Sequence, residues 1–157
     1  STVILTAIGA YQLGEVLRAA ERLEERGIVT AVNYMIEPGR FRDPRGRREA
    51  AWQIQASQRE QLYPEQTPHR VFACHTRPEV IAGVLRPLDS GLRTVFLGYA
   101  NHGGTLSTAG MLFINRLSWA HIMRATARSL GMELAQVLDR GEIDALEGRR
   151  SPHGVIV

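Results

Sequence analysis

The chain has no lysine, a single cysteine and no long apolar run, and each of these shortages narrows the class of protein. No stretch of 18 or more apolar residues occurs, so we expect no membrane span. No basic region precedes the first apolar stretch, which argues against a secretory signal. The one thiol, Cys74, cannot form an internal disulfide, and its apolar surroundings predict a buried, inert side chain. A reducing cytoplasm is the expected location.

All nineteen basic residues are arginine, and the formal net charge is only +3. Uniform use of arginine is typical of a genome rich in G and C, although arginine also suits phosphate binding. Five arginines cluster in one stretch punctuated by glycine and proline. With Phe41 as its only aromatic platform, this stretch predicts a solvated loop or a subunit contact, and we expect no nucleic acid partner. The five are Arg40, Arg42, Arg45, Arg47 and Arg48.

The N-terminal third shows the pattern of a parallel sheet. Residues 3–8 form a short apolar run that is followed by Gly9 and then by apolar residues at helical spacing as far as residue 23. Gly27 is placed to end that helix, and residues 28–35 form the next strand. Because a helix joins two strands, they are expected to pair in parallel.

The remaining pattern continues the alternation. It predicts a polar helix over residues 48–62, a strand over 70–74, a helix over 79–85 that begins after Pro78, and a strand over 94–97. Residues 111–115 fit a helix start or a short strand. Ser118 is placed to cap a helix over 119–130 that ends at Gly131.

Together these elements predict one α/β domain over residues 1–157, since a chain of 157 residues has room for one sizeable core. The expected architecture is a three-layer α/β/α sandwich around a mostly parallel, doubly wound sheet of about five strands. The core is expected over residues 2–138. Residues 139–157 are expected to form a charged tail, in which 155–157 could add an edge strand.

The stretch from residue 98 to 108 lies at a strand-to-helix turn, where backbone N–H groups often face a ligand or a partner chain. The three hydroxyls at its end could bind phosphate or simply cap the next helix. No Gly-x-Ser-x-Gly elbow and no metal-ligand spacing occurs, so no catalytic residue and no metal site is predicted. The candidate binding or interface residues, including one histidine at the end of an earlier strand, are His75, Tyr99, His102, Gly103, Gly104, Thr105, Ser107 and Thr108.

Three strings carry a resemblance to a known family. They are Phe72-Ala73-x-His75-x-x-Pro78-x-x-Ile81-x-x-x-Leu85, Gly98-Tyr99-x-x-x-Gly103-x-Thr105 and Met111-x-x-x-Asn115-x-Leu117-x-x-x-His121. They resemble the C-terminal domain of phosphoketolases, which belong to the thiamine-diphosphate ketolase group that includes transketolase. The start of the chain is similar too, so the resemblance spans about residues 2–130. The chain departs from the family's threonine run and Pro-Phe-Asp over residues 104–110, and from its acid–Arg pair at 118–119.

The resemblance implies a transketolase C-terminal-like fold and a non-catalytic accessory domain of a longer, two-carbon-transferring enzyme. It also implies a homodimer in which this domain packs against the catalytic domains, or a companion subunit, and forms part of the active-site rim. Thiamine diphosphate and magnesium would be held on those other domains by a Gly-Asp-Gly motif, which this chain lacks. The alternative is a stand-alone regulatory module that binds an anion such as a nucleotide at the carboxyl edge of its sheet.

Overall fold

The structure, a computed structural model, describes residues 2–100 and 104–157. Its centre is a sheet of four parallel strands in the order β2-β1-β3-β4. The two central strands are almost wholly buried, which explains why each reads as a continuous apolar run rather than an alternating one. The strands are β1 (Thr2–Ile8), β2 (Val29–Tyr34), β3 (Arg70–Cys74) and β4 (Thr94–Gly98).

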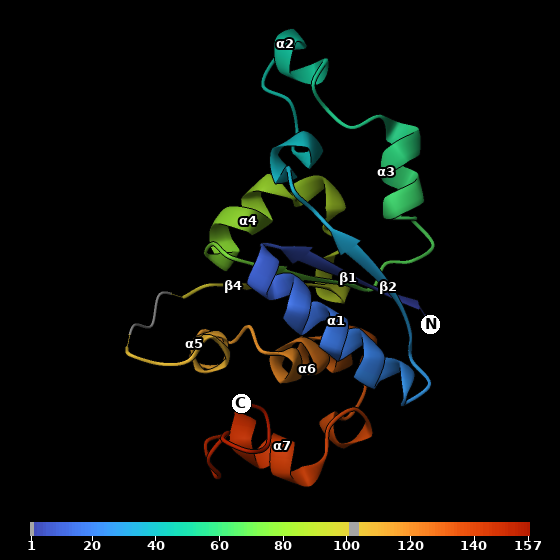
Figure 1. Cartoon of the computed structure of the whole chain (residues 1–157). Helices are drawn as coiled ribbons and strands as arrows, with labels where there is room; N and C mark the ends of the chain where they lie inside the picture. Colours follow the sequence, from blue (N-terminus) through green and yellow to red (C-terminus); the bar gives the residue numbers. More distant parts are fainter. Residues whose placement is uncertain (1, 101–103) are drawn as a thin grey trace.

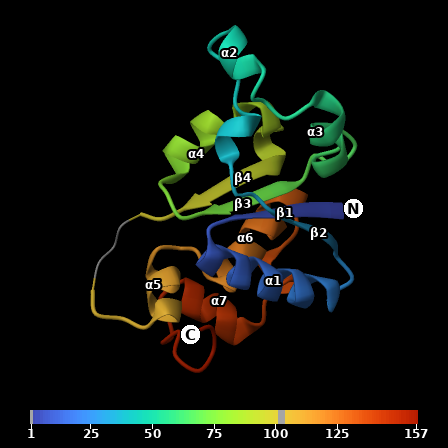
Figure 2. The same ribbon diagram turned by 45° about the horizontal axis from the view of Figure 1, so that its top comes forward.

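Helices cover both faces of the sheet, as Figures 1 and 2 show. On one face, α1 (Ala10–Glu24) lies over β1 and β2, and α6 (Trp119–Leu130) lies over β3 and β4. On the other face lies α4 (Pro78–Val84). The predicted three-layer α/β arrangement is therefore confirmed. The short turns are η1 (Pro38–Phe41), η2 (Arg86–Leu88), η3 (Gly91–Arg93) and η4 (Leu134–Gln136).

Alternation along β1 divides the core between the two faces. Val3, Leu5 and Ala7 belong to the cluster beneath α1 and α6, whereas Ile4 and Ile8 belong to the cluster beneath α4. Every one of these side chains is at most 2% exposed. Burial of both faces holds the strand register, because a slip by one residue would exchange the two sets.

Several predicted boundaries are confirmed. Pro78 is the first residue of α4, where its missing N–H leaves no helix bond unmade. Gly131 ends α6 in the left-handed conformation, with φ 67°. Residues 111–115, which fitted either a helix or a strand, belong mostly to α5 (Thr108–Ile114).

The predicted helix over 48–62 is wrong in its continuity. The structure has two short helices, α2 (Arg47–Ala50) and α3 (Ala56–Leu62), separated by a turn. Between them the Ile54 N–H donates to the Arg40 carbonyl at 3.0 Å, so the backbone folds back onto the preceding loop. Residues 38–62, here called the arm, extend beyond the sheet (Figure 1), and Trp52 within the arm stays exposed.

The C-terminal residues also differ from expectation. Residues 155–157 form no fifth strand; they turn back so that the Ile156 and Val157 N–H groups donate to the Pro152 carbonyl. The expected tail instead contains α7 (Arg140–Leu146), which lies outside the α1 and α6 layer (Figure 1). Ala145 and Ile156 join the core, and the Trp119 indole N–H donates to the Ile156 carbonyl at 3.2 Å.

Candidate functional site

The carboxyl ends of β1 and β3 lie side by side at the point where the chain changes direction across the sheet. From β1 the chain passes to β2 on one side, and it later returns to β3 on the other. Ile8 pairs with Cys74, so Gly9 and His75 are neighbours immediately beyond the sheet. Doubly wound sheets bind ligands at such switch points.

His75, predicted as a candidate, is exposed at this edge with its ring held in place. The Ile8 carbonyl accepts the His75 backbone N–H at 3.0 Å and also lies 2.9 Å from the ring Nδ1. A carbonyl can only accept, so this bond puts the proton on Nδ1 and leaves Nε2 for another partner. The ring is thus oriented by the strand beside it.

A cavity of about 530 Å³ opens at this switch point. It is formed by the turn into α1, the residues after β3 and β4, and the start of α5, all on the left of Figure 1. Among the described residues that line it there is neither an arginine nor a carboxylate, although the chain holds nineteen arginines. The lining is Gly9, Ala10, Tyr11, Gln12, His75, Tyr99, Leu106, Thr108, Met111 and Leu112.

Gln12 lines this cavity and was missed by the sequence analysis. It is 4% exposed, and no hydrogen-bond partner for its side-chain amide occurs within residues 2–100 and 104–157. Gly9 makes its position possible: φ is 121° there, and a Cβ on Gly9 would lie 2.2 Å from the Gln12 Oε1. The available signal was a glutamine three residues after the glycine that precedes a helix.

The candidates between residues 98 and 108 divide into four groups. Tyr99 and Thr108 line the cavity together with His75. Ser107 is the N-cap of α5, where its hydroxyl accepts the Gly110 N–H at 3.1 Å, as the capping alternative expected. Gly104 and Thr105 are exposed and outside the cavity lining, and His102 and Gly103 fall outside the described residues.

His121, the last residue of the resembling strings, packs inside the protein. Its Nδ1 lies 2.7 Å from the Ser118 hydroxyl, and its ring meets the edge of Phe113. Burial, with smaller effects from Arg124 and Arg116, lowers its pKa to about 3. A histidine that stays neutral at ordinary pH is a packing residue rather than an acid or base for catalysis.

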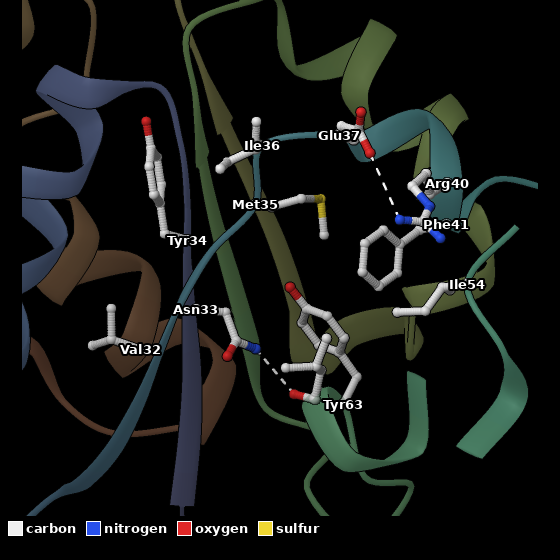
Figure 3. Close-up of a pocket in the computed structure, with 11 residues that line it drawn as sticks. Val32, Asn33, Tyr34, Met35, Ile36, Glu37, Arg40, Phe41, Ile54 and Tyr63 are labelled. Carbon is white, nitrogen blue, oxygen red and sulfur yellow. Dashed lines mark hydrogen bonds and ion pairs between the residues drawn. The ribbon is translucent and has the colours of Figure 1, made fainter. Parts of the chain in front are cut away.

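A second cavity, of about 570 Å³, lies beside the edge strand β2. Figure 3 shows Met35, Phe41 and Ile54 pointing into it next to Tyr63. The Tyr63 ring continues a row of aromatic rings across the sheet face, stacked on Phe72 at 5.9 Å. Apolar and aromatic side chains therefore point into this cavity, and Asn33, Glu37 and Arg40 also line it.

The arm above this cavity carries the arginine cluster. Glu49 accepts from Arg42 at 2.6 Å and from Arg45 at 2.7 Å, and these hydrogen bonds, with that of the Arg45 backbone, lower its pKa to about 2. Arg40 donates to the Trp52 carbonyl at 3.2 Å. Three of the five arginines thus have acceptors inside the arm, which fits a structured loop rather than an open phosphate-binding surface.

Within the described ranges, no group of three or more His, Cys, Asp or Glu side chains is arranged to hold a metal ion. The same ranges contain no helix with the length and apolar character needed to cross a bilayer.

Comparison with known proteins yields fold information only. No family model matches the chain, and the curated proteins give no match. A similar solved structure is described as a split-gene transketolase in an inactive β4 tetramer, with a TM-score of 0.54 and 19% identity. The similarity covers 83% of this chain and 40% of that one, so this chain spans less than half of its length. The chain therefore has an α/β fold like the C-terminal part of transketolase. This likeness does not single out phosphoketolase.

Proposed function

We propose that this chain is an accessory domain of a thiamine-diphosphate-dependent enzyme that transfers a two-carbon unit from a keto-sugar phosphate or a keto acid. The observation that carries the proposal is the fold likeness to a split-gene transketolase over 83% of this chain. The strings around His75, Gly98 and His121 add support and favour a phosphoketolase-like parent. The buried thiol of Cys74 suits a cytoplasmic enzyme.

The residues present do not fit the cofactor itself. The chain lacks a Gly-Asp-Gly motif, and the described residues hold no acidic cluster suited to magnesium. Thiamine diphosphate and its metal would therefore be bound by other domains of the same chain or by a companion subunit. The role left for this domain is to pack against them and to complete the rim of their site.

The surface around the β2 cavity has the character of a packing surface. Ile36 is 78% exposed, and Tyr34 and Leu62 add further exposed apolar area around the same cavity. Apolar side chains gathered around a hollow mark protein contacts more often than open surface. We propose that the catalytic domains pack against this surface.

The proposal is tested first on the gene. A segment that encodes Gly-Asp-Gly upstream, in the same or an adjacent reading frame, is expected, and its absence would overturn the proposal. The stand-alone binding module makes the opposite prediction, because it needs no such neighbour.

The packing surface is tested by Ile36→Asp in the complete protein or complex. A charge on this exposed side chain should weaken association at least about tenfold, since an isolated carboxylate is costly to bury in an interface. Leu92→Asp is the matched control, because Leu92 is 94% exposed and lies in η3, at the opposite end of the sheet. Equal effects of the two substitutions would remove the β2 surface from the proposal.

A further inference from the structure

We propose that the switch-point cavity, with Gln12 at its base, binds a small monocarboxylate that has an apolar body. The inference is independent of the proposed function, because ligand binding in this cavity needs no catalytic partner. The cavity lies at the start of α1, away from residues 139–157.

The first support is the unpaired amide of Gln12. A side-chain amide that faces a cavity and bonds to no protein group keeps its donors and its acceptor free for a ligand there. Gln12 is 4% exposed, yet it lines the cavity and finds no partner in the described part of the chain. A ligand in the cavity would supply the missing partner.

The second support is the start of α1, which lines the same cavity through Ala10, Tyr11 and Gln12. The first N–H groups of a helix have no partner inside the helix, and no side chain caps this one. No acidic residue lies in its first turn. With fifteen residues, α1 presents donors and a positive helix end to a bound anion.

The charge of the ligand follows from what the lining lacks. Among the described lining residues none is an arginine, so a phosphate dianion would find uncharged N–H and O–H donors, the His75 ring and a helix end to offset two charges. A carboxylate carries a single negative charge, which these donors can offset. Leu106, Met111 and Leu112 form an apolar wall beside these donors, so the rest of the ligand is aliphatic or aromatic.

The test uses the 157-residue chain with phenylacetate and 4-methylpentanoate as probes, and with inorganic phosphate and AMP for comparison. Titration followed by NMR should show saturable shifts at Gln12, His75 and Met111 with the carboxylates only. Tighter binding of AMP or phosphate at these residues would overturn the assignment to a carboxylate. The absence of any saturable shift would overturn the site.

Gln12→Met separates binding from folding. Methionine keeps the volume and removes the amide, so carboxylate affinity should fall at least about tenfold while the Tm of the free protein stays within about 2 °C. Gln61→Met, at an exposed position of α3, is the matched control and should change neither. A Gln12 variant with lower Tm and unchanged affinity would make Gln12 a purely structural residue and overturn the proposal.

Leu106→Glu provides a second variant that leaves the core intact, because Leu106 is 47% exposed at the rim of the cavity. The added negative charge should weaken carboxylate binding several-fold through repulsion. Leu92→Glu, far along the sheet, should leave the affinity unchanged. Equal affinities in the two variants would contradict the site.

Discussion

At the scale of single residues, His121 links the buried core to pH. Its ordinary pKa of 6.5 is lowered to about 3 in the folded protein, first by burial and then by Arg124 and Arg116. Between these two values the unfolded chain binds a proton that the folded chain does not. The proton on His121 therefore does not reduce the free energy of unfolding above pH 6.5, and it lowers this free energy progressively as the pH falls towards 3.

We predict that His121→Asn removes this decline. Between pH 6 and pH 4.5 the free energy of unfolding of the unsubstituted chain should fall by up to about 1.4 kcal/mol per pH unit from this one proton. Urea unfolding at several pH values measures the slope, and the variant should show a shallower one. His153→Asn, at an exposed position, should keep the original slope. Parallel slopes for all three proteins would mean that His121 is not the responsible group.

The close packing of the backbone at the carboxyl edge of the sheet depends on Gly98. A Cβ there would lie 2.3 Å from the Thr76 carbonyl oxygen and 2.5 Å from the Pro78 nitrogen, both of them backbone atoms. The chain entering Tyr99 passes close to the start of α4 only because position 98 has no side chain.

Gly98→Ala should therefore lower the free energy of unfolding by about 3 kcal/mol. Gly14→Ala is the contrasting substitution: Gly14 is an exposed residue inside α1 with no atom within 4 Å of its added Cβ. It should raise stability by about 0.8 kcal/mol through helix propensity. Chemical denaturation measures the free energy of unfolding of both variants. An unchanged value for Gly98→Ala would show that the backbone around residues 76–78 can move to make room for the added Cβ.

At the scale of elements, α7 is held to the core by a pair of charges. Glu142 accepts from Arg22 of α1 and, through its other oxygen, from the Asp139 N–H at 2.8 Å. Arg22 in turn lies over the Trp119 ring at 4.2 Å. One carboxylate thus joins α7 to both α1 and α6.

We predict that Glu142→Ala costs about 2–3 kcal/mol, because it leaves a half-buried guanidinium without its partner. Glu147→Ala removes a pair with Arg149 in which both side chains are largely solvated, and should stay within about 0.5 kcal/mol. Thermal or urea unfolding compares the two. If both variants match the unsubstituted chain, α7 does not contribute to the core as the contacts indicate.

These contacts also show why the sequence predicted some elements and not others. Elements that bury a face on the sheet, such as α1 and β3, have strong apolar periodicity and were predicted within one or two residues. The arm and α7 do not pack on the sheet, so their patterns were read as one polar helix and as a tail. Their structure depends on long-range bonds, such as that between Arg22 and Glu142, which no local pattern contains.

The candidate site divides in the same way. The end of β3 and the start of α5 can be found from sequence, and three of the candidates named there, His75, Tyr99 and Thr108, line one cavity. Gln12 was missed, because its spacing from Gly9 is a weak signal and only the folded chain shows that its amide faces the cavity.

At the scale of the whole molecule, the fold likeness covers most of this chain but less than half of the transketolase chain. Under the proposed function, a domain of this kind, without a thiamine-binding motif, depends on a partner for activity. Its exposed apolar surface beside β2 and its polar carboxyl edge are separate regions, so packing and ligand binding can be altered independently.

Reconstitution of two-carbon transfer tests this account most directly. The chain is mixed with the polypeptide encoded upstream that carries Gly-Asp-Gly, in the presence of thiamine diphosphate and magnesium. Activity should require both components and should fall sharply with Ile36→Asp but not with Leu92→Asp. Equal activity of the upstream polypeptide with and without this chain would contradict the account, as would thiamine-dependent activity of this chain alone.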